Sequence, residues 1–260
     1  MRPFFVPLLG AIALALALGA PSGACTAAAG APDDGGTASE GEGGAGEGEG
    51  SRIEARVVST GWNAGPDGLQ VIDRQTGNKV EIDVRIARSA RWLLVGDRSV
   101  RVELRVPAGI LANLHTHDGA IIADGVKGTL KLRTGDGRIE ATRVDGTLEG
   151  DTGDGSIRVR GRLDLLRLRT GDGSIEAELS AGSKMASAWD ITTGDGHITL
   201  RLPDGFGAEL DAHTGDGSLD VGFPISSKGV SNHDIRGRLN DGGPALKVRT
   251  GDGSIKVIRN

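Results

Sequence analysis

Apolar and polar residues alternate along most of the chain from residue 111 onward, and glycine-rich hexamers interrupt this alternation at intervals. Before each hexamer every second residue is mostly apolar, as in "LKLRT" at residues 130–134 and "LRLRT" at 166–170. After the hexamer's threonine, an aliphatic residue follows five places on and a second apolar residue two places later. A period of two on both sides of a glycine turn predicts two strands, each with one dry face.

The hexamer is TGDGSI or a near copy of it, and a weaker copy, THDGAI, begins at Thr116. The other copies begin at Thr134, Thr152, Thr170, Thr193, Thr214 and Thr250, so the steps are 18, 18, 18, 23, 21 and 36 residues. A period near 20 is typical of stacked repeats. We therefore predict an all-β, single-domain parallel β-solenoid with about 18–23 residues per coil and Gly-Asp-Gly corners. Stacking then shields aliphatic residues of one coil with those of the next.

Each part of the hexamer has a structural explanation. Glycine adopts positive φ at little cost, which suits a sharp turn between strands. The aspartate is expected to bond nearby backbone N–H groups, and the threonine hydroxyl to bond its counterpart in the next coil. The predicted corner glycines are Gly135, Gly137, Gly153, Gly155, Gly171, Gly173, Gly194, Gly196, Gly215, Gly217, Gly251 and Gly253.

The same aspartates suggest calcium as a chemical alternative, because stacking places their carboxylates in a column. This candidate calcium ladder consists of Asp136, Asp154, Asp172, Asp195, Asp216 and Asp252. One Asp per coil departs from the denser pattern of calcium-binding β-rolls. Arginines near the turns, namely Arg133, Arg169 and Arg249, could neutralise the column instead. A phosphate-binding loop is disfavoured because GxxxxGK[ST] is absent.

A glycan-active β-helix enzyme is a further alternative, but catalysis needs acids and bases gathered in one cleft. Here the acids recur evenly along the chain, which is typical of a scaffold. His115 and His117 lie two apart on a predicted strand and could ligate a metal from one face, although surface histidines are the simpler interpretation. We therefore expect no enzyme activity and no cofactor.

The N-terminal residues predict export. Arg2 precedes an almost wholly apolar run from Val6 to Ala20, which is short for a membrane span, and residues 1–24 resemble a signal peptide. Cys25, the only cysteine, then resembles the lipidated residue of a bacterial lipoprotein. We expect an extracytoplasmic protein anchored to a membrane by lipid at Cys25, with plain secretion as the alternative.

Residues 25–51 combine Cys25 with a Gly/Glu-rich segment that contains no residue able to anchor a core, so we expect a disordered tether. The whole chain has a formal charge of −5, and the tether carries six acids and no base, which leaves residues 52–260 nearly neutral. A neutral body argues against nucleic acid as a partner. The expected partner is an unidentified envelope or surface component.

The body divides into two regions by pattern. Residues 52–110 contain short alternating runs without the hexamer, and we expect these strands to cap the solenoid of residues 111–260. A turn-rich stretch at about residues 223–244 explains the 36-residue step as a loop insertion, and it is the candidate partner-binding loop. The Thr250 hexamer is then expected to close the final coil.

These motifs resemble a bacterial β-strand-repeat domain family of unknown function that carries the label "putative adhesin". The resemblance rests on the corners, on the V-P-A-G of Val106 to Gly109, and on the G-R-L-N-D-G-G of Gly237 to Gly243. It covers about residues 52–260. It implies the β-repeat architecture and an adhesin-like surface role, and it supplies no catalytic residues.

Overall fold

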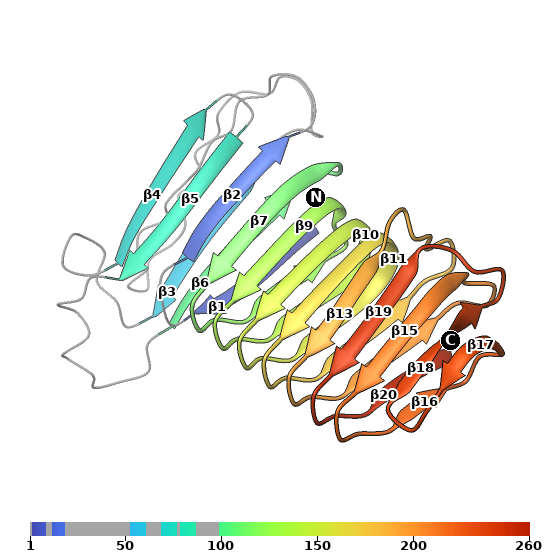
Figure 1. The fold of residues 1–260 in the computed structure, drawn as a ribbon. Coiled ribbons are helices and arrows are strands. Elements are labelled where there is room, and N and C mark those ends of the chain that lie inside the picture. Colours follow the sequence, from blue (N-terminus) through green and yellow to red (C-terminus); the bar gives the residue numbers. More distant parts are fainter. Residues whose placement is uncertain (1, 9–11, 19–52, 61–68, 77–78, 87–98) are drawn as a thin grey trace.

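The computed structural model describes residues 2–8, 12–18, 53–60, 69–76, 79–86 and 99–260. These residues form twenty strands and no helix, joined in one curled, mixed sheet (Figure 1). The predicted all-β class is therefore confirmed. Within the described ranges no helix has the length and apolar character needed to cross a membrane. Cys25, the tether and the end of the predicted leader lie outside the described residues.

The strands fall into an N-terminal group, the repeat region and a C-terminal hairpin. The N-terminal group is β1 Arg2–Leu8, β2 Ile12–Leu18, β3 Glu54–Thr60, β4 Leu69–Thr76, β5 Lys79–Ile86 and β6 Ser99–Val106. The repeat region is β7 Ile110–Thr116, β8 Ile121–Asp124, β9 Lys127–Thr134, β10 Ile139–Thr152, β11 Ile157–Thr170, β12 Ile175–Leu179, β13 Trp189–Thr193, β14 Ile198–Leu202, β15 Ala208–Thr214, β16 Leu219–Val221, β19 Ala245–Thr250 and β20 Ile255–Arg259. The hairpin is β17 Ile225–Val230 and β18 Asp234–Leu239.

Strands of the repeat region pair in parallel with the equivalent strands of neighbouring repeats. Thr152 of β10 is in register with Thr134 of β9 on one side and with Thr170 of β11 on the other. Ile139 is likewise in register with Ile121 and Ile157. The 18-residue spacing of the hexamers is thus the pairing offset of these strands.

Equivalent apolar side chains lie above one another in the core. The isoleucines that follow the corners are at most 1 % exposed: Ile121, Ile139, Ile157, Ile175, Ile198 and Ile255. Leu219 is partly buried because β16 pairs only with β20 and ends the stack. Each fully buried aliphatic side chain contributes roughly 1.5–3 kcal/mol relative to exposure. The predicted apolar ladder is therefore confirmed for these positions.

The last repeat does not lie at the end of the stack. β19 pairs in parallel with β13 on one side and with β15 on the other. Similarly, β20 lies between β14 and β16. The expectation that the Thr250 coil closes the stack is wrong: it is inserted between the Thr193 and Thr214 coils.

The stretch expected to be a loop insertion contains a β-hairpin. β17 pairs with β18, and β18 pairs antiparallel with β15 along the edge that β19 leaves open. Such a strand covers backbone groups that would otherwise be an exposed sheet edge. The loop expectation is therefore corrected, because this segment caps one end of the stack (Figure 1).

The opposite end is extended by antiparallel strands. β3 pairs with β6, and β4 forms a hairpin with β5. Between these strands and the repeats lie β1, which pairs with β6 and β8, and β2, which pairs with β5 and β7. β1 and β2 belong to the predicted leader, so its removal would take these pairing partners away from β5, β6, β7 and β8.

Candidate functional site: the corners and the charged outer face

The corner threonines join neighbouring coils. Thr170 Oγ1 donates to the Gly155 carbonyl of the adjacent coil at 2.8 Å and accepts from Gly173 N of its own corner at 3.3 Å. The same pair of bonds occurs at Thr134, Thr152, Thr193, Thr214 and Thr250. The hydroxyl therefore bonds a glycine carbonyl and not, as expected, another threonine. In the described part of the chain, no corner aspartate carboxylate accepts a hydrogen bond.

The corner glycines are needed for close approach and not for positive φ. None of them has a φ in the left-handed region, in contrast to Gly109 and Gly205. Gly171 N donates to the Gly153 carbonyl at 2.5 Å, and a Cβ on Gly171 would lie 2.6 Å from that oxygen. The sequence analysis explained these glycines by a need for positive φ, and that explanation is wrong. Glycine is needed because the backbone of the neighbouring coil lies too close for any side chain.

The corner aspartates are exposed and stacked in the order of their coils. Gly251 N donates to Gly194 O and Gly215 N to Gly251 O, which places Asp252 between Asp195 and Asp216. Among the described residues no group of three or more His, Cys, Asp or Glu is placed to hold a metal ion. The column is therefore a feature of the exposed surface.

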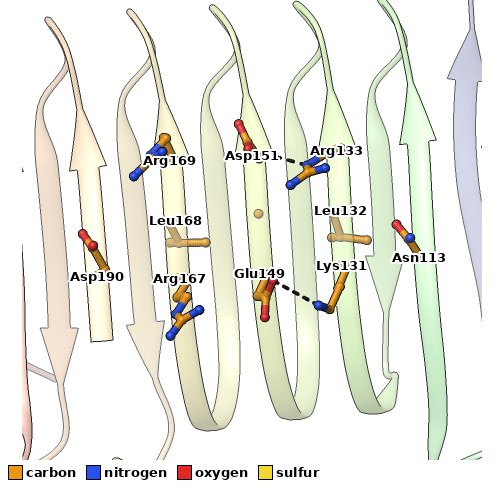
Figure 2. Close-up of a pocket in the computed structure, with 11 residues that line it drawn as sticks. Asn113, Lys131, Leu132, Arg133, Glu149, Asp151, Arg167, Leu168, Arg169 and Asp190 are labelled. Atoms are coloured by element: carbon orange, nitrogen blue, oxygen red, sulfur yellow. Dashed lines mark ion pairs between the residues drawn. The ribbon is translucent and has the colours of Figure 1, made fainter. Parts of the chain in front are cut away.

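The outer face of the sheet carries charges that alternate in sign between strands. Lys131 pairs with Glu149 at 3.5 Å, and Arg133 pairs with Asp151 at 3.6 Å (Figure 2). Of the three arginines suggested to neutralise the corner column, Arg133 and Arg249 instead pair with Asp151 and Asp211 on the outer face. The third, Arg169, makes no ion pair within the described residues. The sequence signal for this face is the sign change between equivalent polar positions of successive repeats.

A shallow depression of about 460 Å³ lies on this face where the inward side-chain ladder is interrupted by Gly150. A Cβ on Gly150 would lie 3.1 Å from Leu168 Cδ2, so the leucine of the next coil occupies the missing volume. Leu132 and Leu168 line the depression together with polar residues. Its charged residues are Lys131, Arg133, Glu149, Asp151, Arg167, Arg169 and Asp190.

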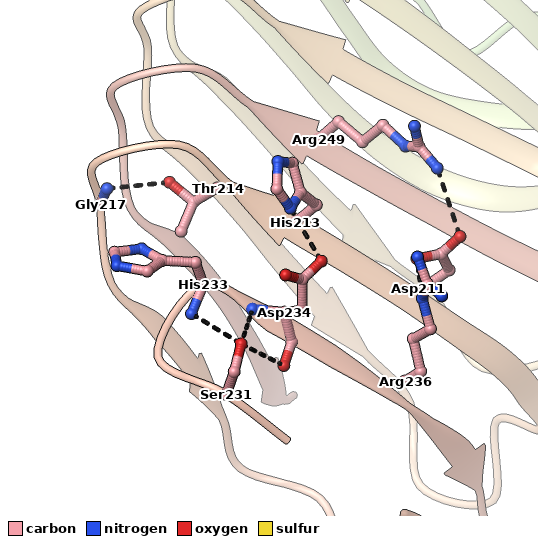
Figure 3. A network of polar contacts seen from close by, with 9 residues as sticks. All are labelled: Asp211, His213, Thr214, Gly217, Ser231, His233, Asp234, Arg236 and Arg249. Carbon is pink, nitrogen blue, oxygen red and sulfur yellow. Dashed lines mark hydrogen bonds and ion pairs between the residues drawn. The ribbon is translucent and has the colours of Figure 1, made fainter. Parts of the chain in front are cut away.

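His213, Ser231 and Asp234 do not have the arrangement of a catalytic triad. His213 Nδ1 lies 2.8 Å from Asp234 Oδ1, yet Ser231 Oγ bonds backbone N–H groups of His233 and Asp234 (Figure 3). A serine nucleophile would instead need its hydroxyl within reach of the imidazole. The contact between His213 and Asp234 therefore links β15 to its capping strand β18.

His115 and His117, for which surface histidines were the simpler interpretation than a metal pair, have ring centroids 5.5 Å apart. Burial lowers the pKa of His115, and the positive charges of His117 and Arg133 lower it further. Both side chains are largely exposed, so the burial that acts on His115 is partial.

The fold and the corners define a class of all-β repeat protein. The chain belongs to the family described as Toastrack DUF4097, whose model matches residues 112–258. This confirms the family resemblance seen in the sequence, and the family is a domain of unknown function. A search of curated proteins finds no match.

A solved structure, described as a "putative cell adhesion protein" from Clostridium sporogenes, is similar over 76 % of this chain and 80 % of its own. The sequence identity is 12 % and the TM-score is 0.36.

Proposed function

We propose that the chain is a non-catalytic, adhesin-like surface or scaffold protein, exported from the cytoplasm and tethered to a bacterial membrane through lipid on Cys25. In this proposal the repeats form a parallel β-solenoid of about 18–23 residues per coil. Residues 25–51 act as a spacer that holds the body away from the membrane. Plain secretion is the alternative localisation.

The solenoid interpretation is supported by the pairing offsets and the corner bonds. Strands before and after each corner pair with the equivalent strands of the neighbouring coil, as in Thr152 with Thr170 and Ile157 with Ile175. Hydrogen bonds between coils then run the length of the corner column.

The non-catalytic role is supported chiefly by the even distribution of charged and polar side chains over the repeats. Charged groups pair between neighbouring strands on both outer faces, as Arg158 does with Glu176 and Arg133 with Asp151. Corner threonines are used in bonds between coils. An enzyme would be expected to gather acids, bases and oxyanion donors in one place.

The anchor is tested by metabolic labelling with a palmitate analogue in a bacterial host. We expect the wild type to be labelled and to sediment with membranes, and Cys25→Ser to be unlabelled and soluble. Lack of label on the wild type would contradict lipidation. If the unlabelled wild type is recovered from the medium or periplasm, the secreted alternative holds.

The surface role is tested by cross-linking the tethered protein in intact cells and identifying the envelope components captured. Capture of the same component by the wild type and not by a Cys25→Ser form would support a role at the membrane surface. Turnover of cell-wall or capsular glycans by the purified protein would contradict it, because this would favour the glycan-active alternative.

Calcium binding is a second candidate, since the corner aspartates stack in one exposed column. Calcium favours clustered carboxylate oxygens. This candidate predicts that chelation lowers the melting temperature of the wild type by many degrees.

A further inference from the structure

The alternation of charge on the outer face fails at Thr192 of β13, in the middle of the sheet, where an acid would continue it. Two rows of residues run across the strands in register. The first row is Lys131, Glu149, Arg167, Asp190, Lys247, Asp211 and Arg236. The second row is Arg133, Asp151, Arg169, Thr192, Arg249, His213 and Asp234. In the first row the sign changes at every step, whereas in the second Thr192 and His213 stand where acids would continue the pattern, one on each side of Arg249.

This interruption leaves Arg169 without an acidic neighbour on one side. On its other side lies Asp151, which already pairs with Arg133 at 3.6 Å. Arg169 makes no ion pair within the part of the chain that the structure describes, and Figure 2 shows its side chain at the rim of the depression. Its guanidinium therefore keeps its hydrogen-bonding capacity for a ligand.

Arg167 is in a similar position in the first row. Its neighbour Glu149 pairs with Lys131 at 3.5 Å, and its other neighbour Asp190 accepts a hydrogen bond from Thr192 Oγ1 at 2.9 Å. Figure 2 shows no ion pair from Arg167 to the residues around it. Both acids beside Arg167 are thus already engaged.

Across β13, the last coil supplies two more cations. Lys247 and Arg249 of β19 are in register with Asp190 and Thr192. Arg249 pairs with Asp211 at 3.3 Å, but Asp211 is shared with Arg236 at 3.2 Å. Three adjacent strands therefore present four cations against one carboxylate. We define the cationic patch as Arg167, Arg169, Asp190, Thr192, Lys247 and Arg249.

We propose that the cationic patch binds the phosphate or sulfate groups of an extended polyanion, with Arg169 and Arg249 holding one oxyanion across Thr192. A guanidinium presents a planar set of donors that matches phosphate and sulfate oxygens. The two arginines stand two strands apart, about 10 Å at the backbone. Their side chains can therefore converge on one group from opposite sides.

An extended polymer fits this surface better than a lipid bilayer does. The patch lies on a β-sheet face, bounded by the Lys131–Glu149 pair on one side and by Asp211 and Arg236 on the other. Peripheral membrane binding is strengthened by apolar side chains that enter the bilayer. The exposed large hydrophobic residues of the described chain are Val58 and Leu111, and neither belongs to the patch. A linear chain of anionic groups can cross the patch without such an anchor.

This inference rests on the proposed surface role for the source of the polymer, but its test does not depend on the anchor. The probe is fluorescently labelled inorganic polyphosphate, and binding is followed by anisotropy with the full chain carrying Cys25→Ser. We expect Thr192→Asp, which places an acid between Arg169 and Arg249, to weaken binding about tenfold or more, since it repels the anion. Arg169→Gln should weaken it similarly. Thr192→Asp loses the hydrogen bond to Asp190 but gains Arg169 and Arg249 as neighbours, so its melting curve must show a folded protein at the assay temperature, which separates lost binding from lost folding.

The matched control is Lys184→Gln, which changes the net charge by the same amount on an exposed loop outside the patch. This variant should bind polyphosphate like the parent. Equal weakening by Lys184→Gln would overturn the proposal in favour of a general charge effect. So would absence of polyphosphate binding, equally tight binding of inorganic phosphate alone, or a preference for vesicles of anionic lipid. Failure of palmitate labelling would instead affect only the proposed anchor.

Discussion

Lys247 of β19 lies in register between Asp190 of β13 and Asp211 of β15. If the coils were stacked in chain order, β13 and β15 would be neighbours and Asp190 would face Asp211. Like charges directly opposite one another destabilise a sheet. Insertion of the last coil therefore replaces a repulsive contact between two aspartates with a cation flanked by two acids.

Charge reversal at this position should measure the effect. Lys247→Glu places three acids side by side, and we expect it to lower the free energy of unfolding by about 0.2–1 kcal/mol for each pair affected. The free energy of unfolding of Lys247→Gln should lie between those of Lys247→Glu and the wild type. The control is Lys256→Glu, whose neighbours are Asp220 and the neutral Thr199. Chemical denaturation at low salt gives the values, and equal losses at the two lysines would contradict this account.

Gly155→Ala should be strongly destabilising. The backbone of the neighbouring coil occupies the place of the new methyl group, because the Gly137 carbonyl is in direct contact there. Overpacking of this kind costs about 1–3 kcal/mol and occasionally more. Gly229→Ala is the control, since no atom lies within 4 Å of the corresponding Cβ position. Thermal melts should show a large loss for the first variant and little change for the second.

Thr170→Val tests the bonds between coils. The substitution keeps the shape of the side chain but removes the hydroxyl that serves Gly155 O and Gly173 N. A buried polar group left unsatisfied costs about 1–3 kcal/mol. Thr170→Ser retains the hydroxyl and should be closer to the wild type in urea denaturation. If valine were tolerated better than serine, the hydroxyl would have no such role.

Neutralising the corner column should stabilise the protein. Asp154→Asn with Asp172→Asn removes like charges stacked about 4.8 Å apart, and asparagine is also a good turn residue. We expect a gain of about 0.2–1 kcal/mol per site at low salt, and a smaller gain at high salt. Differential scanning fluorimetry with added calcium or chelator gives the comparison. A calcium-dependent rise in melting temperature, lost in the double variant, would favour calcium-dependent folding.

Acidification should destabilise the wild type partly through His115. Burial and two nearby positive charges lower its pKa in the folded protein. The unfolded chain therefore binds more protons as the pH falls through about 6.5, so stability is lost in that direction. His115→Asn lacks this contribution, and its melting temperature should fall less between about pH 7.5 and about pH 5.5. Parallel curves for the two proteins would rule the contribution out.

The structure also changes the explanation of the corner. Sequence alone shows that glycine and threonine recur there, and chemistry suggests turns with positive φ and aspartate bonds. The observed reason is contact between coils: the Gly153 carbonyl approaches Gly171 too closely for a side chain, and the threonine bonds across the same gap. Such contacts join residues of different repeats, so no single hexamer reveals them.

The sequence by itself determined the strands, their dry faces, the corners and the offset of 18 residues, because each depends on a local period that every repeat carries. Only the tertiary structure decided which coil lies beside which. The corners are nearly identical and the buried aliphatic residues are similar in every repeat, so the sequence allows several orders of stacking. Differences in outward charge, as at Asp190, Lys247 and Asp211, distinguish these orders only when the strands are side by side. The same long-range arrangement turned the expected loop into a capping hairpin, because its backbone hydrogen bonds are made with β15.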